Sequence, residues 1–294
     1  SLYHPVILIG VLAIVGIVSG NQWRKTVFLS VLICGLCLLW CLKNLMIFGF
    51  FGTSSWAGLS LWKITRENYS ARELVQRVRD GLIEPAVVEI PMYYKPSYYR
   101  RYGFLRTSPV DVLSRDDYNN INIIAISKMY GRSARRVIAD DPAHYLNNVI
   151  LAYLRYCIPS SRYDGVKENS ARLGVLEKIY SQVILNQWLT RELDTRFNIP
   201  AFSPVMLFLF PLSLAVYILH LIRGSPMSVR GLAEAVRADS VLFFSALLIL
   251  YSVAVSCLAD FGENERFKFL IEPLGWAFLI GLLVRLKSGL SKSE

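Results

Sequence analysis

The chain has 294 residues, of which 54% are apolar and 18% charged, and it carries a net charge of +10. A single soluble core does not need so much apolar surface, and the long uncharged runs exclude a wholly soluble protein and a disordered one. The positive charge fits the cytoplasmic loops of a membrane protein, so no nucleic-acid partner is expected. The cysteines form no disulfide framework, because Cys157 is the only one in the polar middle of the chain.

Five apolar runs approach the roughly 20 residues that cross a bilayer core of about 30 Å. In chain order they cover about Pro5–Gly20, Thr26–Phe51, Ala201–Ile222, Val241–Leu258 and Phe269–Leu286. We therefore predict a mainly α fold, a polytopic membrane protein with about five transmembrane helices. Residues 1–51 hold two spans, 52–200 form a mostly helical extracytoplasmic domain, and 201–294 hold three spans and a short cytoplasmic tail.

The orientation follows from the short loops, where lysine and arginine mark the cytoplasmic side. Basic residues lie in loop 21–25, in loop 223–239 and in the C-terminal tail, and these three segments share one side if all five spans cross. This places Ser1 outside without an obvious export signal. We therefore expect the chain to be the C-terminal portion of a longer protein whose earlier spans precede it.

Between the second and third spans the sequence predicts several helices. Ser70 and Glu73 form a capping-box pattern, and Asp141-Pro142 is a typical helix start. Further helices are expected from Asp116 through Ile121, Ile124 and Met129, and over 173–189. The short segment Ala86–Ile90 is a candidate edge strand.

The sequence contains none of the nucleotide-binding, nucleophile-elbow or zinc-protease motifs of soluble enzymes. The three histidines, His4, His144 and His220, lie far apart in different predicted elements, so no metal site is expected. Cys34, Cys37 and Cys41 share a face of an apolar span, where packing is the better explanation.

The most informative segment begins at Asp260 and precedes the last predicted span. Ionisable groups at membrane depth are costly and usually face a cavity, which makes this segment a candidate site. An arginine can hold a phosphate through its planar fork of donors, and carboxylates can bind sugar hydroxyls or act as a base. The alternative is a charged interfacial turn that anchors two helices. The candidate side chains are Glu263, Glu265, Arg266, Lys268 and Glu272.

A tyrosine- and arginine-rich segment covers residues 91–102. Such residues suit sugar stacking, but a headgroup belt or simple core packing is the better explanation. Asn68-Tyr69-Ser70 is an N-glycosylation acceptor pattern that matters only in a eukaryotic cell.

Three stretches together resemble the GT-C-type polytopic glycosyltransferases, the superfamily of the mannosyl- and aminoarabinosyltransferases. Residues 43–49 with Ser54-Ser55-Trp56 resemble the exit from a late span of these enzymes. The helix start at 141–146 with the later 156–159 is similar to their soluble-loop pattern. Residues 263–267 followed by Pro273 are similar to the signature before their last span.

This resemblance implies transfer of a sugar from a polyprenyl-phosphate carrier to an acceptor on the outer face of the membrane. The lipid-linked sugar is the donor substrate, Arg266 contacts its phosphate, and Glu265 orients Arg266. The catalytic carboxylate of the superfamily lies in a first outer loop that has no counterpart here, so the catalytic residue is unknown. The resemblance favours an integral protein of a bacterial inner membrane, with the ER membrane as the alternative.

Two other classes stay open from the residues alone. A non-enzymatic membrane protein with an extracytoplasmic partner-binding or sensing domain explains the missing catalytic motif. A transporter is less favoured, because the spans show neither an inverted repeat nor an intramembrane charge pair.

Overall fold

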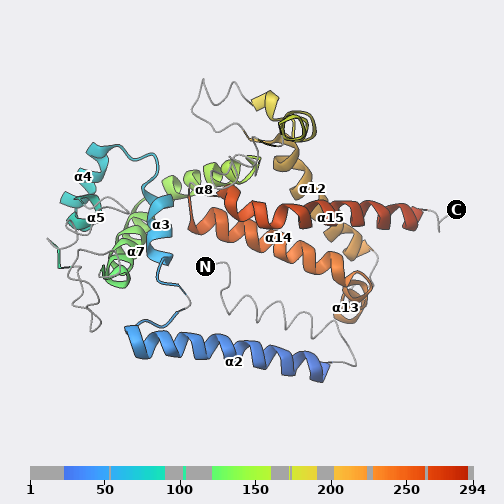
Figure 1. The fold of residues 1–294 in the computed structure, drawn as a ribbon, viewed down its shortest axis with the longest axis horizontal. Coiled ribbons are helices and arrows are strands. Elements are labelled where there is room, and N and C mark those ends of the chain that lie inside the picture. Colours follow the sequence, from blue (N-terminus) through green and yellow to red (C-terminus); the bar gives the residue numbers. More distant parts are fainter. Residues whose placement is uncertain are drawn as a thin grey trace. The chain divides into compact units, whose positions relative to one another are not determined.

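Most of the described residues in the computed structural model of the protein are helical. The structure describes residues 23–52, 54–89, 102–103, 121–159, 172, 174–190, 202–223, 228–261 and 264–290. These residues contain no β-strand, so the predicted mainly α fold class is confirmed for them. Figure 1 shows the helices in chain order. Their bounds are α2 Trp23–Phe48, α3 Ala57–Arg66, α4 Ala71–Arg79, α5 Pro85–Glu89, α7 Ile123–Asp140, α8 Pro142–Tyr156, α10 Val175–Lys178, the π-helix η5 Ile179–Ile184, the 3₁₀ helix η6 Gln187–Thr190, α12 Pro204–Arg223, α13 Val229–Ala238, α14 Ser240–Ala259 and α15 Asn264–Leu290.

Three helices are long and apolar enough to cross a membrane. They are the stretch Val31–Phe48 of α2, Pro204–Arg223 of α12 and Ser240–Ala259 of α14, which match the second, third and fourth predicted spans. The first predicted span lies outside the described residues. The fifth falls within α15, a helix of 27 residues, and its crossing stays a prediction, as do the orientation and the limits 1–51, 52–200 and 201–294.

The chain divides into two compact units. Unit 1 contains residues 40–150 and 258–261, and unit 2 contains 151–257 and 262–294 together with the first part of α2. The boundary at residue 150 falls inside α8.

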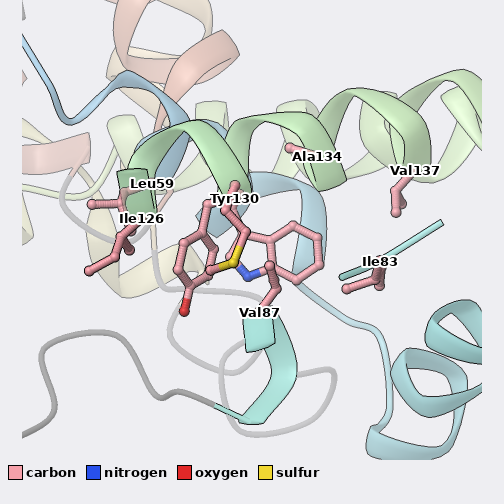
Figure 2. Packing of buried hydrophobic residues seen from close by; sticks show 9 residues of the cluster. Leu59, Ile83, Val87, Ile126, Tyr130, Ala134 and Val137 are labelled. Atoms are coloured by element: carbon pink, nitrogen blue, oxygen red, sulfur yellow. The ribbon is translucent and has the colours of Figure 1, made fainter. Parts of the chain in front are cut away.

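Unit 1 is built around the packing of α3 against α7. Its core is a cluster of buried side chains from α3, the turn after α4, α5 and α7 (Figure 2). The ring of Trp62 lies 6.1 Å from the ring of Tyr130, and both side chains are fully buried. The remaining members are Leu59, Ile83, Val87, Ile126, Met129, Ala134 and Val137.

Two glycines let α3 and α7 approach closely. A Cβ built on Gly58 would lie 1.8 Å from the backbone oxygen of Ser127, and one built on Gly131 would lie 3.1 Å from the Cα of Gly58. The backbone N–H of Gly58 donates to Ser127 Oγ at 3.1 Å. Only a residue without a side chain fits this contact, so the contact fixes how the two helices cross.

The helix starts in unit 1 follow their sequence signals in two places. Ser70 and Glu73 form the predicted capping box at α4. The carboxylate of Asp141 accepts from the backbone N–H of His144 at 3.0 Å and so caps α8, which has Pro142 at its first position. Both predictions are confirmed.

Of two other predictions for this region, one is wrong and one is confirmed in part. Residues 85–89 form the helix α5 and not an edge strand, with Val87 buried in the core cluster. The helix expected from Asp116 through Ile121, Ile124 and Met129 is confirmed for Ile124 and Met129, which lie in α7. It begins at Ile123 and does not include Ile121, because Asn122 caps it by accepting from the N–H of Ala125 at 3.2 Å. Residues 104–120 lie outside the described residues.

Unit 2 gathers α12, α13, α14 and α15 around a second cluster. Leu214 and Tyr217 of α12, Ile249 of α14 and Phe278 of α15 are buried together. The rings of Tyr217 and Phe278 meet edge to face at 5.6 Å. Figure 1 shows α14 and α15 running alongside each other, in orange and red.

The helix predicted over 173–189 is interrupted. A short α-helix, α10, runs directly into the π-helix η5, and the chain then breaks at Leu185 and Asn186 before η6. Asn186 has φ +50°, a left-handed conformation that no helix continues through. Leu185 is fully buried there against Cys157 and Met206, and burial of this side chain accounts for the break.

Candidate functional site

A cavity of about 400 Å³ lies within unit 2. Its walls come from the end of α8 and from α12, α14 and α15, and most of the lining side chains are apolar, among them Phe210, Leu214, Ile249 and Ile271. Pockets of this size and lining suit the apolar part of a ligand, while a few polar groups fix its orientation.

The polar groups come mainly from one face of α15. Lys268, Glu272 and Trp276 follow one another at intervals of four residues, and this spacing places them on one side of the helix. Lys268 and Glu272 line the cavity and are 3% and 8% exposed. The Lys268 ammonium lies 3.9 Å from the Glu272 carboxylate.

Lys268 is held from two further directions. Its ammonium donates to the backbone oxygen of Ile158, in the segment after α8, and lies 3.0 Å from the sulfur of Met206 on α12. The segment after α8 is itself tied to α12, because the N–H of Ser203 donates to the Cys157 oxygen at 2.9 Å. The cation therefore joins α8, α12 and α15 at the cavity wall.

Glu272 is held by a tyrosine from η5. The Tyr180 hydroxyl donates to the Glu272 carboxylate, and Trp276 Nε1 donates to the Tyr180 oxygen at 3.0 Å. Burial, and then the neighbouring Glu272, raise the pKa of Tyr180 above its ordinary value. The phenol thus stays protonated and serves as a donor to the carboxylate.

The other titratable groups on the cavity wall are also neutral. Burial raises the pKa of Cys157 to about 12, although the Lys268 ammonium opposes this rise. A thiol with such a pKa is not a nucleophile at neutral pH. Burial likewise raises the pKa of Tyr153 and of Tyr156, whose hydroxyls bond to the Leu207 oxygen and to Ser252.

Close helix contacts shape the wall beside the pair. A Cβ on Gly275 would lie 2.8 Å from the ring of Phe210, so the glycine lets α12 and α15 approach here. The Phe210 ring also meets the Trp276 ring edge to face at 5.7 Å. Pro211 in α12 and Pro273 in α15 each remove one helical hydrogen bond next to the cavity.

Of the four predicted substrate-binding residues, the structure places Lys268 in the cavity wall. Glu265 and Arg266 lie in the first turn of α15, and their side chains are outside the described residues, as is Glu263 altogether. Glu272, expected from sequence to lie at membrane depth, is brought together with Lys268. Sequence reasoning missed Tyr180, whose contact with Glu272 spans 92 positions and has no local signal.

The arrangement offers defined chemistry. An ammonium and a carboxylate at one edge of an apolar cavity can bind a phosphate and a hydroxyl of an amphiphile whose chain fills the rest. The described residues contain no group of three or more metal-ligating side chains.

Comparison of the chain with protein-family models, curated proteins and solved structures finds no match in any of the three.

Proposed function

We propose that the chain is the part of a membrane glycosyltransferase that holds a polyprenyl-phosphate-linked sugar, the donor for transfer to an acceptor on the outer face of the membrane. The observation that carries this proposal is the buried Lys268–Glu272 pair at the edge of an otherwise apolar cavity. A lipid-linked donor combines a long apolar chain with a phosphate. The cavity offers apolar side chains for the first and the Lys268 ammonium for the second.

In this proposal the apolar walls take isoprenoid units and Lys268 faces the phosphate. Arg266, two residues before Lys268 on α15, is the position to which the resemblance gives a phosphate contact, and it adds a second cation for the leaving phosphate. The Glu272 carboxylate, 3.9 Å from the Lys268 ammonium, would order the sugar or acceptor hydroxyls. Cationic groups lower the barrier by stabilising the charge that develops on the leaving phosphate.

The test is equilibrium binding of a polyprenyl phosphate to the full chain in detergent. Lys268→Gln should weaken binding by roughly 10- to 150-fold, the worth of a charge-assisted hydrogen bond of about 1.5–3 kcal/mol. Lys287→Gln, which removes an exposed cation near the end of the same helix, is the matched control and should bind normally.

A second pair of variants tests the cavity without touching the ion pair. Ala215 lines the cavity, whereas Leu212, on the same helix, is exposed and does not. Ala215→Trp should abolish binding and Leu212→Trp should not. Equal binding by all four variants would overturn the donor-site proposal and favour a non-enzymatic protein with a partner-binding domain.

A further inference from the structure

A second hollow, of about 490 Å³, lies in unit 1 at the end of α2. Gly49, with φ +62°, ends the helix, and its N–H donates to the Leu45 oxygen at 2.8 Å. The side-chain amide of Asn44 then donates to the Gly52 oxygen at 2.7 Å and folds the following loop back on the helix. The segments 43–49 and 54–56, noted above for their resemblance, thus form one wall of this hollow.

The hollow has aromatic walls and one cation. Trp40 and Trp56 line it and are 53% and 42% exposed. The Lys43 ammonium lies 3.7 Å from the centre of the Trp40 ring. Among the described residues no carboxylate lies within ion-pair distance of Lys43, and no acidic side chain lines the hollow.

The remaining polar lining includes several hydrogen-bond donors beside the side-chain oxygen of Asn44. Ser54 and Ser55 contribute hydroxyls, and Asn122 uses its side-chain oxygen to cap α7, so its NH₂ group is the part left to donate. Within the described lining, the cation lies beside neutral donors and no carboxylate competes for it, which favours an anion with several acceptor oxygens.

The surroundings of the hollow indicate that this anion belongs to a membrane lipid. Only 6% of the apolar stretch Val31–Phe48 is buried, and Met46 and Ile47, beside the hollow, are 85% and 62% exposed. A helix with such a surface is solvated by acyl chains, and lysine and tryptophan at its end lie at headgroup level. An anion that reaches Lys43 there is carried by a lipid.

We propose that this hollow binds the phosphate head group of an anionic membrane phospholipid, with Lys43 facing the phosphate and Trp40 and Trp56 beside the glycerol and upper acyl chains. The site is separate from the cavity of unit 2 and does not rest on the glycosyltransferase proposal. It is a specific site and not a diffuse attraction, because the cation, the hydroxyls and the rings line one defined volume.

The experiment uses the full chain in detergent and a phosphatidylglycerol with brominated acyl chains, which quenches nearby tryptophans. We expect saturable quenching that disappears in the Trp40→Phe/Trp56→Phe variant. Lys43→Gln should weaken phosphatidylglycerol binding about fivefold or more, the effect of about 1 kcal/mol per basic residue near a membrane surface. Brominated phosphatidylcholine should bind more weakly and respond little to Lys43→Gln.

Three arms make the result decisive. Lys25→Gln removes a cation at the other end of α2 and should leave binding unchanged, whereas equal losses in Lys25→Gln and Lys43→Gln would overturn the proposal in favour of diffuse attraction. Lys43→Arg should retain binding, since it keeps the charge. Inorganic phosphate should not displace the lipid at matched concentration; displacement would mean a site for free phosphate and would also overturn the proposal.

Discussion

Lys268 and Glu272 lie one helical turn apart on α15, with ammonium and carboxylate 3.9 Å from each other and neither side chain as much as one-tenth exposed. Each partner has a further polar contact, Lys268 to the Ile158 oxygen and Glu272 to the Tyr180 hydroxyl. A buried charge that loses its partner is strongly destabilising, whereas an apolar replacement of both partners can be neutral.

This difference gives the first prediction. Lys268→Met should lower the free energy of unfolding by about 3–5 kcal/mol, because it removes the Lys268 charge from beside the buried Glu272 carboxylate. Adding Glu272→Gln should recover most of that loss, since no charge is then left buried alone and the amide oxygen can still accept from the Tyr180 hydroxyl. Denaturant unfolding in detergent measures both, and additive losses would contradict the coupling.

The second prediction concerns the crossing of α3 and α7. Gly58→Ala should destabilise unit 1 by about 1–3 kcal/mol or more, because the added methyl would overlap the Ser127 backbone. Gly35→Ala in α2 is the control, since a Cβ there meets nothing within 4 Å, and it should be neutral or mildly stabilising. Thermal unfolding followed by near-UV circular dichroism reports on the packed Trp62.

The third prediction is a pH dependence at the start of α8. The backbone N–H of His144, and with smaller effect the Tyr69 hydroxyl, lower the pKa of Asp141 below its ordinary value of 3.8. A carboxyl with a lowered pKa stabilises the fold above its ordinary value, and this contribution is lost as the pH falls through the folded-state pKa.

Asp141→Ala should therefore cost about 1 kcal/mol at pH 7, and the cost should shrink as the pH is lowered below 3.8. Asn122→Ala removes the cap of α7. Because the asparagine side chain does not ionise, the loss of stability in this variant should stay constant with pH. Unfolding measured for the three proteins between pH 7 and 3 checks this. A constant cost for Asp141→Ala would show that the charge does not contribute.

The fourth prediction tests the orientation. In a background without the five cysteines, Ala71→Cys in α4 and Ala238→Cys in α13 each place a thiol at an exposed position. An impermeant maleimide applied to intact cells should label position 71 and leave position 238 unlabelled. The reverse pattern would invert the predicted topology.

Sequence reasoning succeeded where the signal is local. Ser70 with Glu73 and Asp141 with Pro142 start helices through contacts within four residues, and apolar runs predict spans by composition. It failed where tertiary packing decides, because burial of Leu185 and Val87 overrides the local pattern. The candidate site was half predictable: Lys268 ends the charged segment before the last predicted span and Glu272 is a charge within that span, but Tyr180 comes from another part of the chain.

The acceptor pattern at Asn68 illustrates the same limit. The Asn68 side-chain amide donates to Asn148 Oδ1 at 2.8 Å, and the residue has φ +65°. The nitrogen that glycosylation would modify is thus used to hold the turn before α4 against α8, which no triplet pattern reveals.

The contact between Gly58 and Gly131 also bears on how this chain has diverged. The methyl that either position could acquire has no room until the opposite helix shifts, so substitutions at the two sites are coupled. When relatives of this chain are aligned, positions 58 and 131 should covary and hold small residues as a pair. The two positions would then help to recognise relatives whose apolar spans have diverged too far to be aligned.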